Sequence, residues 1–190
     1  MNYELICIGA SWGGLDAIEK LLADIPSEVD APIVIAQHRD AQESALAELM
    51  SRYTARRVVD AVDKQALERN HVYLAPPDYH LLVEPGSLAL SLEERVQYAR
   101  PSIDVLFESA ADAYGPTVIG VILTGANADG AEGLAHIKHC GGVAVIQDPA
   151  EAERREMPTA AIAKTAADAV LPLSDIGKFI YGLCLEPART

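Results

Sequence analysis

A serine set between glycines, Gly9-x-Ser11-x-Gly13, is the first group in the chain that could do chemistry. It lies between a short apolar run, residues 5–8, and a helix-forming run, residues 15–22. This strand–turn–helix pattern is typical of a nucleophile elbow, in which flanking glycines permit a sharp turn that exposes the serine hydroxyl. The free N–H groups and the dipole at the helix start would stabilise negative charge beside it. Ser11 is therefore the candidate nucleophile.

The same turn has two other interpretations. A serine in a glycine-rich turn can act only as a helix cap or as a phosphate contact. A dinucleotide-binding turn of the form G-x-G-x-x-G needs glycine at the third position, where this chain has Ser11. We therefore favour nucleophilic chemistry over nucleotide binding for this turn.

A nucleophilic serine needs a base and a carboxylate that orients the base. His38 comes directly after a predicted buried strand, residues 31–36 with Gln37. Asp129 lies in a glycine-rich loop after the most apolar predicted strand, residues 118–123. Both positions are strand ends, where functional loops begin, and they suggest a serine–histidine–aspartate triad.

Two other aspartates, Asp78 and Asp148, also follow predicted strands. We favour Asp129 because Asp148 precedes a proline, as turn residues often do. Asp129 could also be only the cap of the next helix. The chain order serine, histidine, aspartate differs from the serine, aspartate, histidine order of α/β-hydrolases, so a triad here would belong to another family.

The other histidines have simpler explanations. His71 and His80 lie at the margins of a predicted hairpin. His136, His139 and Cys140 share a helix end and could resemble a metal cluster. No third or fourth ligand is visible at metal spacing, so we expect histidines that pack a helix end, and neither a metal nor a cofactor.

Apolar runs and helical patterns alternate along the chain and must position these groups. Strands are expected at residues 5–8, 31–36, 57–62, 72–75, 118–123, 142–147 and 169–171. Two short apolar runs around Pro85-Gly86 predict a hairpin, residues 80–92. The pattern predicts a doubly wound α/β fold: a mostly parallel sheet with helices on both faces and a small antiparallel hairpin. Without a linker or repeat, residues 1–190 are expected to form a single domain.

The carboxyl ends of parallel strands share one edge of a sheet, where ligands bind in such folds. Ser11, His38 and Asp129 all follow strand ends. We therefore expect all three on that edge.

Composition narrows the classes of function. The net charge of -13 opposes binding to a nucleic-acid backbone. The three cysteines, Cys7, Cys140 and Cys184, lie far apart and do not form a disulfide pattern. The sequence contains neither a signal peptide nor an apolar run of the roughly 20 residues that a membrane span requires. We expect a cytoplasmic protein without membrane insertion.

Several motifs in register resemble the catalytic domain of chemotaxis protein-glutamate methylesterases. They are residues 8–14 (IGASWGG), Gln37-His38, residues 72–80 (VYLAPPDYH), residues 100–107 (RPSIDVLF), and residues 121–125 (VILTG) with Asp129-Gly130. The resemblance covers essentially the whole chain. It implies an α/β hydrolytic domain with Ser11 as nucleophile, His38 as base and Asp129 as the aspartate.

The resemblance also implies a reaction: hydrolysis of glutamate γ-methyl esters on chemoreceptors, with release of methanol, and in some members deamidation of glutamines. The expected partners are the cytoplasmic helices of methylated chemoreceptors and a separate response regulator. Members commonly carry an N-terminal receiver domain. Here the first predicted strand begins a few residues after Met1. We therefore expect the catalytic domain without the receiver, either free-standing or excised.

The chain departs from the family pattern beside the predicted triad. It has Trp12 where threonine is usual, Ala126-Asn127 where methionine and glycine are usual, Arg39-Asp40 for Met-Pro, and Glu156 for the glycine before Met157. We expect the oxyanion and substrate contacts among residues of this rim: Trp12, Gly13, Arg39, Ala126, Asn127 and Met157. Trp12 would contribute its N–H to the oxyanion site, and its ring would narrow the cleft, anchor a partner or cover the helix start. The altered rim also permits an alternative, a catalytically idle relative that binds a partner in the cleft.

Overall fold

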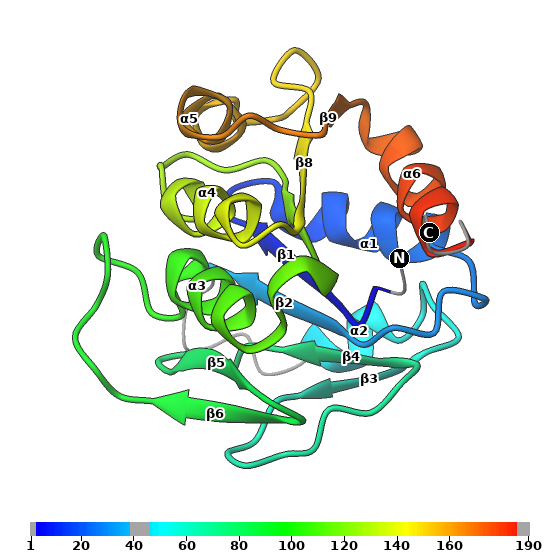
Figure 1. The fold of residues 1–190 in the computed structure, drawn as a ribbon, viewed down its shortest axis with the longest axis vertical. Helices are drawn as coiled ribbons and strands as arrows, with labels where there is room; N and C mark the ends of the chain where they lie inside the picture. Colours follow the sequence, from blue (N-terminus) through cyan, green and yellow to red (C-terminus); the bar gives the residue numbers. More distant parts are fainter. Residues whose placement is uncertain (1–2, 39–45, 186–190) are drawn as a thin grey trace.

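A seven-stranded parallel sheet forms the centre of the molecule (Figure 1). The computed structural model describes residues 3–38 and 46–185. The strand order is β3-β4-β2-β1-β7-β8-β9, and every neighbouring pair is parallel. The strands are β1 (Leu5–Ala10), β2 (Ile33–Gln37), β3 (Arg57–Asp60), β4 (His71–Leu74), β7 (Val118–Ile122), β8 (Val143–Gln147) and β9 (Ala169–Leu171).

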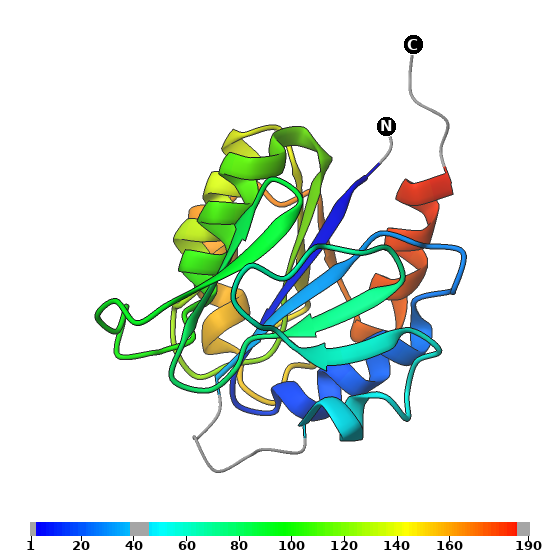
Figure 2. The ribbon, with the colours of Figure 1, turned by 90° about the horizontal axis from the view of Figure 1, so that it is seen from below.

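Helices cover both faces of this sheet (Figures 1 and 2). One face carries α1 (Gly14–Asp24), α2 (Leu46–Met50) and α6 (Leu173–Leu185), and the other carries α3 (Ile103–Tyr114), α4 (Ala131–His139) and α5 (Glu156–Lys164). A short 3₁₀ turn, Gly115–Thr117, follows α3. Side chains alternate along β1, so that Ile6 and Ile8 join one core and Leu5 and Cys7 the other. The predicted doubly wound α/β fold is confirmed.

The predicted hairpin forms a separate two-stranded antiparallel sheet. It consists of β5 (His80–Glu84) and β6 (Ser87–Ser91) and packs against α3 (Figure 1). Leu81 and Leu88 enter the same buried cluster as Phe107 of α3, and the N–H of Val83 donates to Ser109 Oγ. The hairpin thereby buttresses the helix whose first residues lie in the candidate site.

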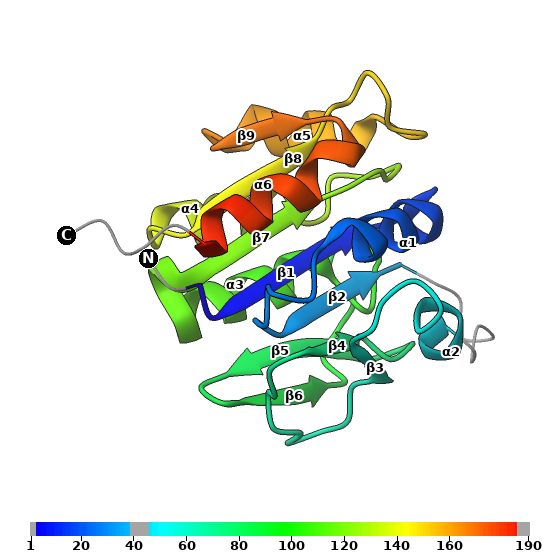
Figure 3. The ribbon, with the colours of Figure 1, turned by 90° about the vertical axis from the view of Figure 1, so that its right-hand side faces the viewer.

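The order of the strands brings the predicted chemistry together. From β1 the chain runs to β2, then to β3 at the edge of the sheet and back to β4 between them, before it places β7 on the other side of β1. Figure 3 views the sheet from the α1 and α6 side, with β2, β1 and β7 side by side. Ser11, His38 and Asp129 follow these three neighbouring strands. Reversal of the winding direction beside β1 marks the position where such sheets bind ligands.

Within residues 3–38 and 46–185, none of the helices combines the length and apolar character needed to cross a membrane.

Candidate active site

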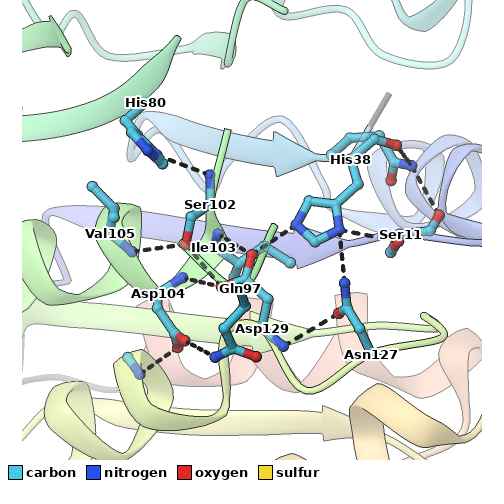
Figure 4. Close-up of polar contacts among 12 residues, drawn as sticks. Ser11, His38, His80, Gln97, Ser102, Ile103, Asp104, Val105, Asn127 and Asp129 are labelled. Carbon is cyan, nitrogen blue, oxygen red and sulfur yellow. Dashed lines mark hydrogen bonds and ion pairs between the residues drawn. The ribbon is translucent and has the colours of Figure 1, made fainter. Parts of the chain in front are cut away.

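His38 lies between Ser11 and Asp129, and each of these two side chains contacts a different ring nitrogen (Figure 4). Nδ1 is 3.1 Å from Ser11 Oγ, and Nε2 is 2.7 Å from Asp129 Oδ2. Both separations fall within hydrogen-bond range. The three side chains therefore form a continuous hydrogen-bonded line from a hydroxyl to a carboxylate.

The carboxylate determines which nitrogen of His38 carries the proton. An ionised Asp129 only accepts hydrogen bonds, so Nε2 of a neutral His38 must be protonated and donate to it. Nδ1 then has a free lone pair facing Ser11 Oγ. The side-chain amide of Asn127 also approaches this nitrogen, with Nδ2 at 3.3 Å. In this tautomer His38 can accept the hydroxyl proton of Ser11.

Asp129 is completely buried and accepts four hydrogen bonds. Besides His38 Nε2, the donors are the hydroxyl of Ser102 and the backbone N–H groups of Ile103 and Asp104, at 2.8–3.0 Å. Burial opposes ionisation, but the hydrogen bonds from His38 and these N–H groups outweigh it and hold the pKa of Asp129 below its ordinary value. The first turn of α3 thus stabilises a buried anion that fixes the orientation of His38.

The structure separates Asp129 from the two alternatives that the sequence left open. Asp78 forms an ion pair with Arg95, with Oδ1 and Nη2 3.1 Å apart. Asp148 accepts the N–H of Ala150 within its own turn. Neither of these hydrogen-bonded partners is a histidine, whereas Asp129 contacts His38.

The turn that presents Ser11 is fastened by neighbouring strand ends. The N–H of Ser11 donates to Thr124 O, and the amide of Gln37 donates to Ser11 O at 2.8 Å. Gly13 caps α1 in the left-handed region at φ 74°, which favours glycine. A Cβ at Gly125 would lie only 2.6 Å from Met157 Cε and 3.0 Å from Ser11 Cβ. Close packing therefore fixes the position of Ser11 from behind.

Two backbone N–H groups at this turn have no acceptor in the described part of the chain. They belong to Trp12 and Gly13, between Ser11 and the first turn of α1. Unpaired N–H groups next to a nucleophile and a helix N-terminus are the usual components of an oxyanion hole. Their availability agrees with the oxyanion role predicted for this turn.

A cleft with a volume of about 640 Å³ opens over Ser11 and His38. Its far wall is the segment 95–101, which contributes Arg95, Tyr98 and Arg100. Tyr98 is almost fully exposed, at 95%. The cleft thus combines a nucleophile, basic side chains and an accessible aromatic ring.

Comparison with known proteins identifies the family to which this arrangement belongs. The family model described as CheB methylesterase matches residues 6–180. The chain belongs to the CheB methylesterase family. It is similar to a Leptospira interrogans protein provisionally named protein-glutamate methylesterase/protein-glutamine glutaminase, with 45% identity over 96% of both chains. Protein-glutamate methylesterase FrzG of Myxococcus xanthus is 43% identical over 92% of this chain but only 53% of its own length.

A solved structure of the same family has the same fold. The catalytic domain of the Thermotoga maritima CheB methylesterase superposes with a TM-score of 0.89 and 29% identity. The match covers 96% of this chain and all of that domain. The resemblance inferred from the motifs is therefore confirmed at the level of family and fold.

The rim residues predicted to contact the oxyanion and the substrate occupy different positions around the cleft. Gly13 and Asn127 line it. Trp12 is 59% exposed and lies on the rim, where its Nε1 donates to Glu153 Oε1 and the guanidinium of Arg154 stacks on its ring. Ala126 is exposed, and Arg39 lies outside the described residues.

Met157 does not fit the substrate-binding role assigned to it. Its side chain is fully buried, and it packs against Gly125 behind Ser11. The motif around Met157 placed it on the correct edge of the sheet. Sequence alone does not distinguish a residue that lines the cleft from one that packs behind it. Met157 supports the nucleophile turn.

Several supporting residues were not predicted as parts of the site. Ser102, which caps α3, also donates to Asp129, and buried His80 accepts the backbone N–H of Ser102. Asp104 accepts Gly133 N–H and the amide of Gln97 (Figure 4). Burial raises the pKa of Asp104 to about 6, and the nearby charge of Asp129 adds to the rise. The RPSID segment carried the only signal for this network, because its polar residues lie at the predicted start of a helix.

Proposed function

We propose that this chain hydrolyses the γ-methyl esters of glutamate side chains in chemoreceptors, with Ser11, His38 and Asp129 as its catalytic triad. The observation that carries the proposal is the bridging position of His38, at 3.1 Å from Ser11 Oγ and 2.7 Å from Asp129 Oδ2. The names of the Leptospira and Myxococcus relatives support the same substrate. Arg95 and Arg100 on the cleft wall suit a segment rich in carboxylates.

In the first half of the reaction, Ser11 Oγ attacks the ester carbonyl carbon while His38 Nδ1 accepts the hydroxyl proton. The carbonyl π electrons move to oxygen, and the N–H groups of Trp12 and Gly13 stabilise this oxyanion. Asp129 stabilises the imidazolium of His38. Collapse of the tetrahedral intermediate breaks the bond to the methoxy oxygen, which takes the proton from Nδ1 and leaves as methanol.

In the second half, a water molecule attacks the acyl group on Ser11, and His38 Nδ1 accepts one of its protons. Return of that proton to Ser11 Oγ releases the glutamate side chain and restores the starting state. A glutamine side chain can follow the same course with ammonia as the leaving group. The name of the Leptospira relative favours this second activity.

The substitution Ser11→Ala tests the proposal. It removes the attacking oxygen, so methanol release from methylated receptor should fall by at least about 10³-fold. Ser27→Ala, on the surface far from the cleft, is the matched control and should keep wild-type activity. Retention of methanol release in folded Ser11→Ala would refute the proposal.

A serine-directed phosphonate separates the enzyme from an idle, partner-binding relative. An activated Ser11 should form a covalent adduct that mass spectrometry locates at this residue, and His38→Ala should prevent it. Failure of the wild-type protein to react would favour a binding module that retains the fold and has lost the chemistry.

A further inference from the structure

A second cluster of reactive side chains lies at the opposite end of the helix pair α3–α4. Asp112 comes from α3, His136 from α4, and Cys140 caps α4. Asp112 Oδ1 is 2.7 Å from His136 Nε2, and Cys140 Sγ is 3.8 Å from the same nitrogen. The ligand atoms of all three residues lie within 4.8 Å of one another. None of them contributes to the chemistry proposed above.

The geometry of this cluster differs from that of a catalytic relay. A relay needs its two partners on opposite ring nitrogens of the histidine, as Ser11 and Asp129 are around His38. Here the carboxylate and the thiol both approach Nε2 of His136. Three donors that converge on one point cannot pass a proton along a line, but they can share a cation placed between them.

The two helices create this convergence. His136 and Cys140 are four residues apart, so they project from one face of α4. Asp112 reaches them because α3 and α4 approach closely at Gly133, where an added Cβ would lie 2.7 Å from Phe107 Cβ. Asp112 is 24 residues before His136, which is why the chain spacing did not reveal it as a third ligand.

The surroundings permit a cation to enter. A shallow groove of about 550 Å³ covers this face. Asp112 and His136 line it together with three further side chains that could bind a metal ion: Glu108, Glu132 and His139. Two lysines of α4 and α5 have carboxylate partners of their own: Lys138 pairs with Asp168, and Lys164 pairs with Glu132. The Asp112 side chain is 73% exposed, so it can move to accommodate an ion.

We propose that Asp112, His136 and Cys140 bind Zn²⁺, with water in the fourth position. A mixed oxygen, nitrogen and sulfur donor set suits zinc, whereas Mg²⁺ and Ca²⁺ require oxygen ligands. Tetrahedral bonds of about 2.0–2.3 Å place ligand atoms about 3.3–3.6 Å apart. The Asp112–His136 contact opens by roughly 0.6 Å to reach this spacing.

Binding requires a thiolate and an unprotonated Nε2. Cys140 releases its proton to solvent as the sulfur–zinc bond forms, and His136 keeps its proton on Nδ1. The ion then links the last turns of α3 and α4, while Asp129 links their first turns through hydrogen bonds. Zinc at this site stabilises the fold without contacting the cleft.

The test is titration of tag-free, metal-stripped full chain with Zn²⁺ by calorimetry. We expect one ion per chain and a rise in Tm of roughly 5–10 °C at a hundredfold excess over Kd. Asp112→Asn and Cys140→Ser should each weaken binding at least about tenfold. Co²⁺ in place of Zn²⁺ should give a thiolate-to-metal charge-transfer band that Cys140→Ser removes.

The controls are His139→Gln, in the same groove but outside the converging set, and Cys184→Ser, a different thiol. Both should bind Zn²⁺ as tightly as the wild type does. The proposal would be overturned if the wild type did not bind Zn²⁺, or if Asp112→Asn and Cys140→Ser bound it as tightly as the wild type does. Loss of Zn²⁺ binding in either control would also overturn it. Mg²⁺ at the same concentration should not raise Tm.

Discussion

Two aspartate–histidine pairs occupy opposite ends of α3 and α4, and both have an oxygen–nitrogen separation of 2.7 Å. The Asp129–His38 pair is enclosed, with side-chain exposures of 0% and 15%, whereas Asp112 and His136 are 73% and 37% exposed. The backbone of α3 donates to Asp129 from two residues. Asp112 has no such shell among its described hydrogen bonds.

The contrast teaches that the length of an aspartate–histidine contact does not define its function. Four donors hold Asp129 ionised despite its burial, and burial keeps it stationary, so it can orient a base for Ser11. Exposure leaves Asp112 free to move and to exchange partners, which suits a ligand for an incoming ion. The position of the third group decides between the two roles: Ser11 lies across the ring of His38, and Cys140 lies beside the Asp112 contact of His136.

Equivalent substitutions in the two pairs should give the largest difference. Asp129→Asn no longer imposes the correct tautomer on His38 or stabilises its cation, so kcat for ester hydrolysis should fall by about 10³–10⁴-fold. Asp112→Asn should leave kcat within about twofold of wild type. Methanol release by both variants, with circular dichroism as a check on folding, measures the contrast. Similar losses in the two variants would erase it.

The shared helix pair provides an intermediate effect. In Gly133→Ala the new Cβ would lie 2.9 Å from Asp104 O and 2.7 Å from Phe107 Cβ, so α3 and α4 must separate. We expect a loss of roughly 1–3 kcal/mol in unfolding free energy, together with weaker Zn²⁺ binding and slower hydrolysis.

Gly182→Ala is the matched control for this substitution. It is also a helical glycine, but a Cβ there meets nothing within 4 Å. The free energy of unfolding of Gly182→Ala should rise by up to about 1 kcal/mol, because alanine has a higher helix propensity than glycine. If Gly133→Ala slows hydrolysis but leaves zinc affinity unchanged, the two ends do not depend on a common helix spacing.

The smallest expected effect is a change in pH dependence at the catalytic end. Burial raises the pKa of Asp104 from 3.8 to about 6, so the folded state keeps a proton that the unfolded state loses. The contribution of Asp104 to the free energy of unfolding is fully present below about pH 4 and is lost as the pH rises through about 6. Asp104→Asn should abolish this pH-dependent loss of stability.

Denaturant unfolding of wild type and Asp104→Asn between pH 4 and 8 measures the difference. Asp129, whose pKa is lowered, has the opposite dependence, since its contribution is lost as the pH falls. It is present in both proteins, so the difference between the curves reports the Asp104 carboxyl together with its interaction with Asp129. Parallel curves across this range would contradict the assignment to Asp104.

The elements were largely predictable because each leaves a local pattern. The elbow at Ser11 and the apolar strands depend on neighbours in the chain, and the structure confirms them. The antiparallel hairpin was predicted from its own residues, but what it packs against was not, because that contact joins segments far apart in the chain.

The site was predictable as a set of strand ends, and its inner details were not. The choice of Asp129 over Asp78 and Asp148 remained open because all three follow strands. Met157 was misassigned to substrate binding because burial depends on packing against Gly125, which is 32 residues away in the chain. The sequence placed His136 and Cys140 at one helix end but did not reveal Asp112 as a third ligand, because Asp112 and His136 meet only across two helices.

The sequence by itself determined the local conformations and the types of reactive group, because these depend on side-chain chemistry and on residues a few positions apart. Only the tertiary structure decided which groups meet. The placement of β7 beside β1 brings Asp129 to His38, and the packing of α3 on α4 brings Asp112 to His136. The difference between an orienting carboxylate and a metal ligand then follows from burial, which is set by the layers of the folded chain and not by the aspartate itself.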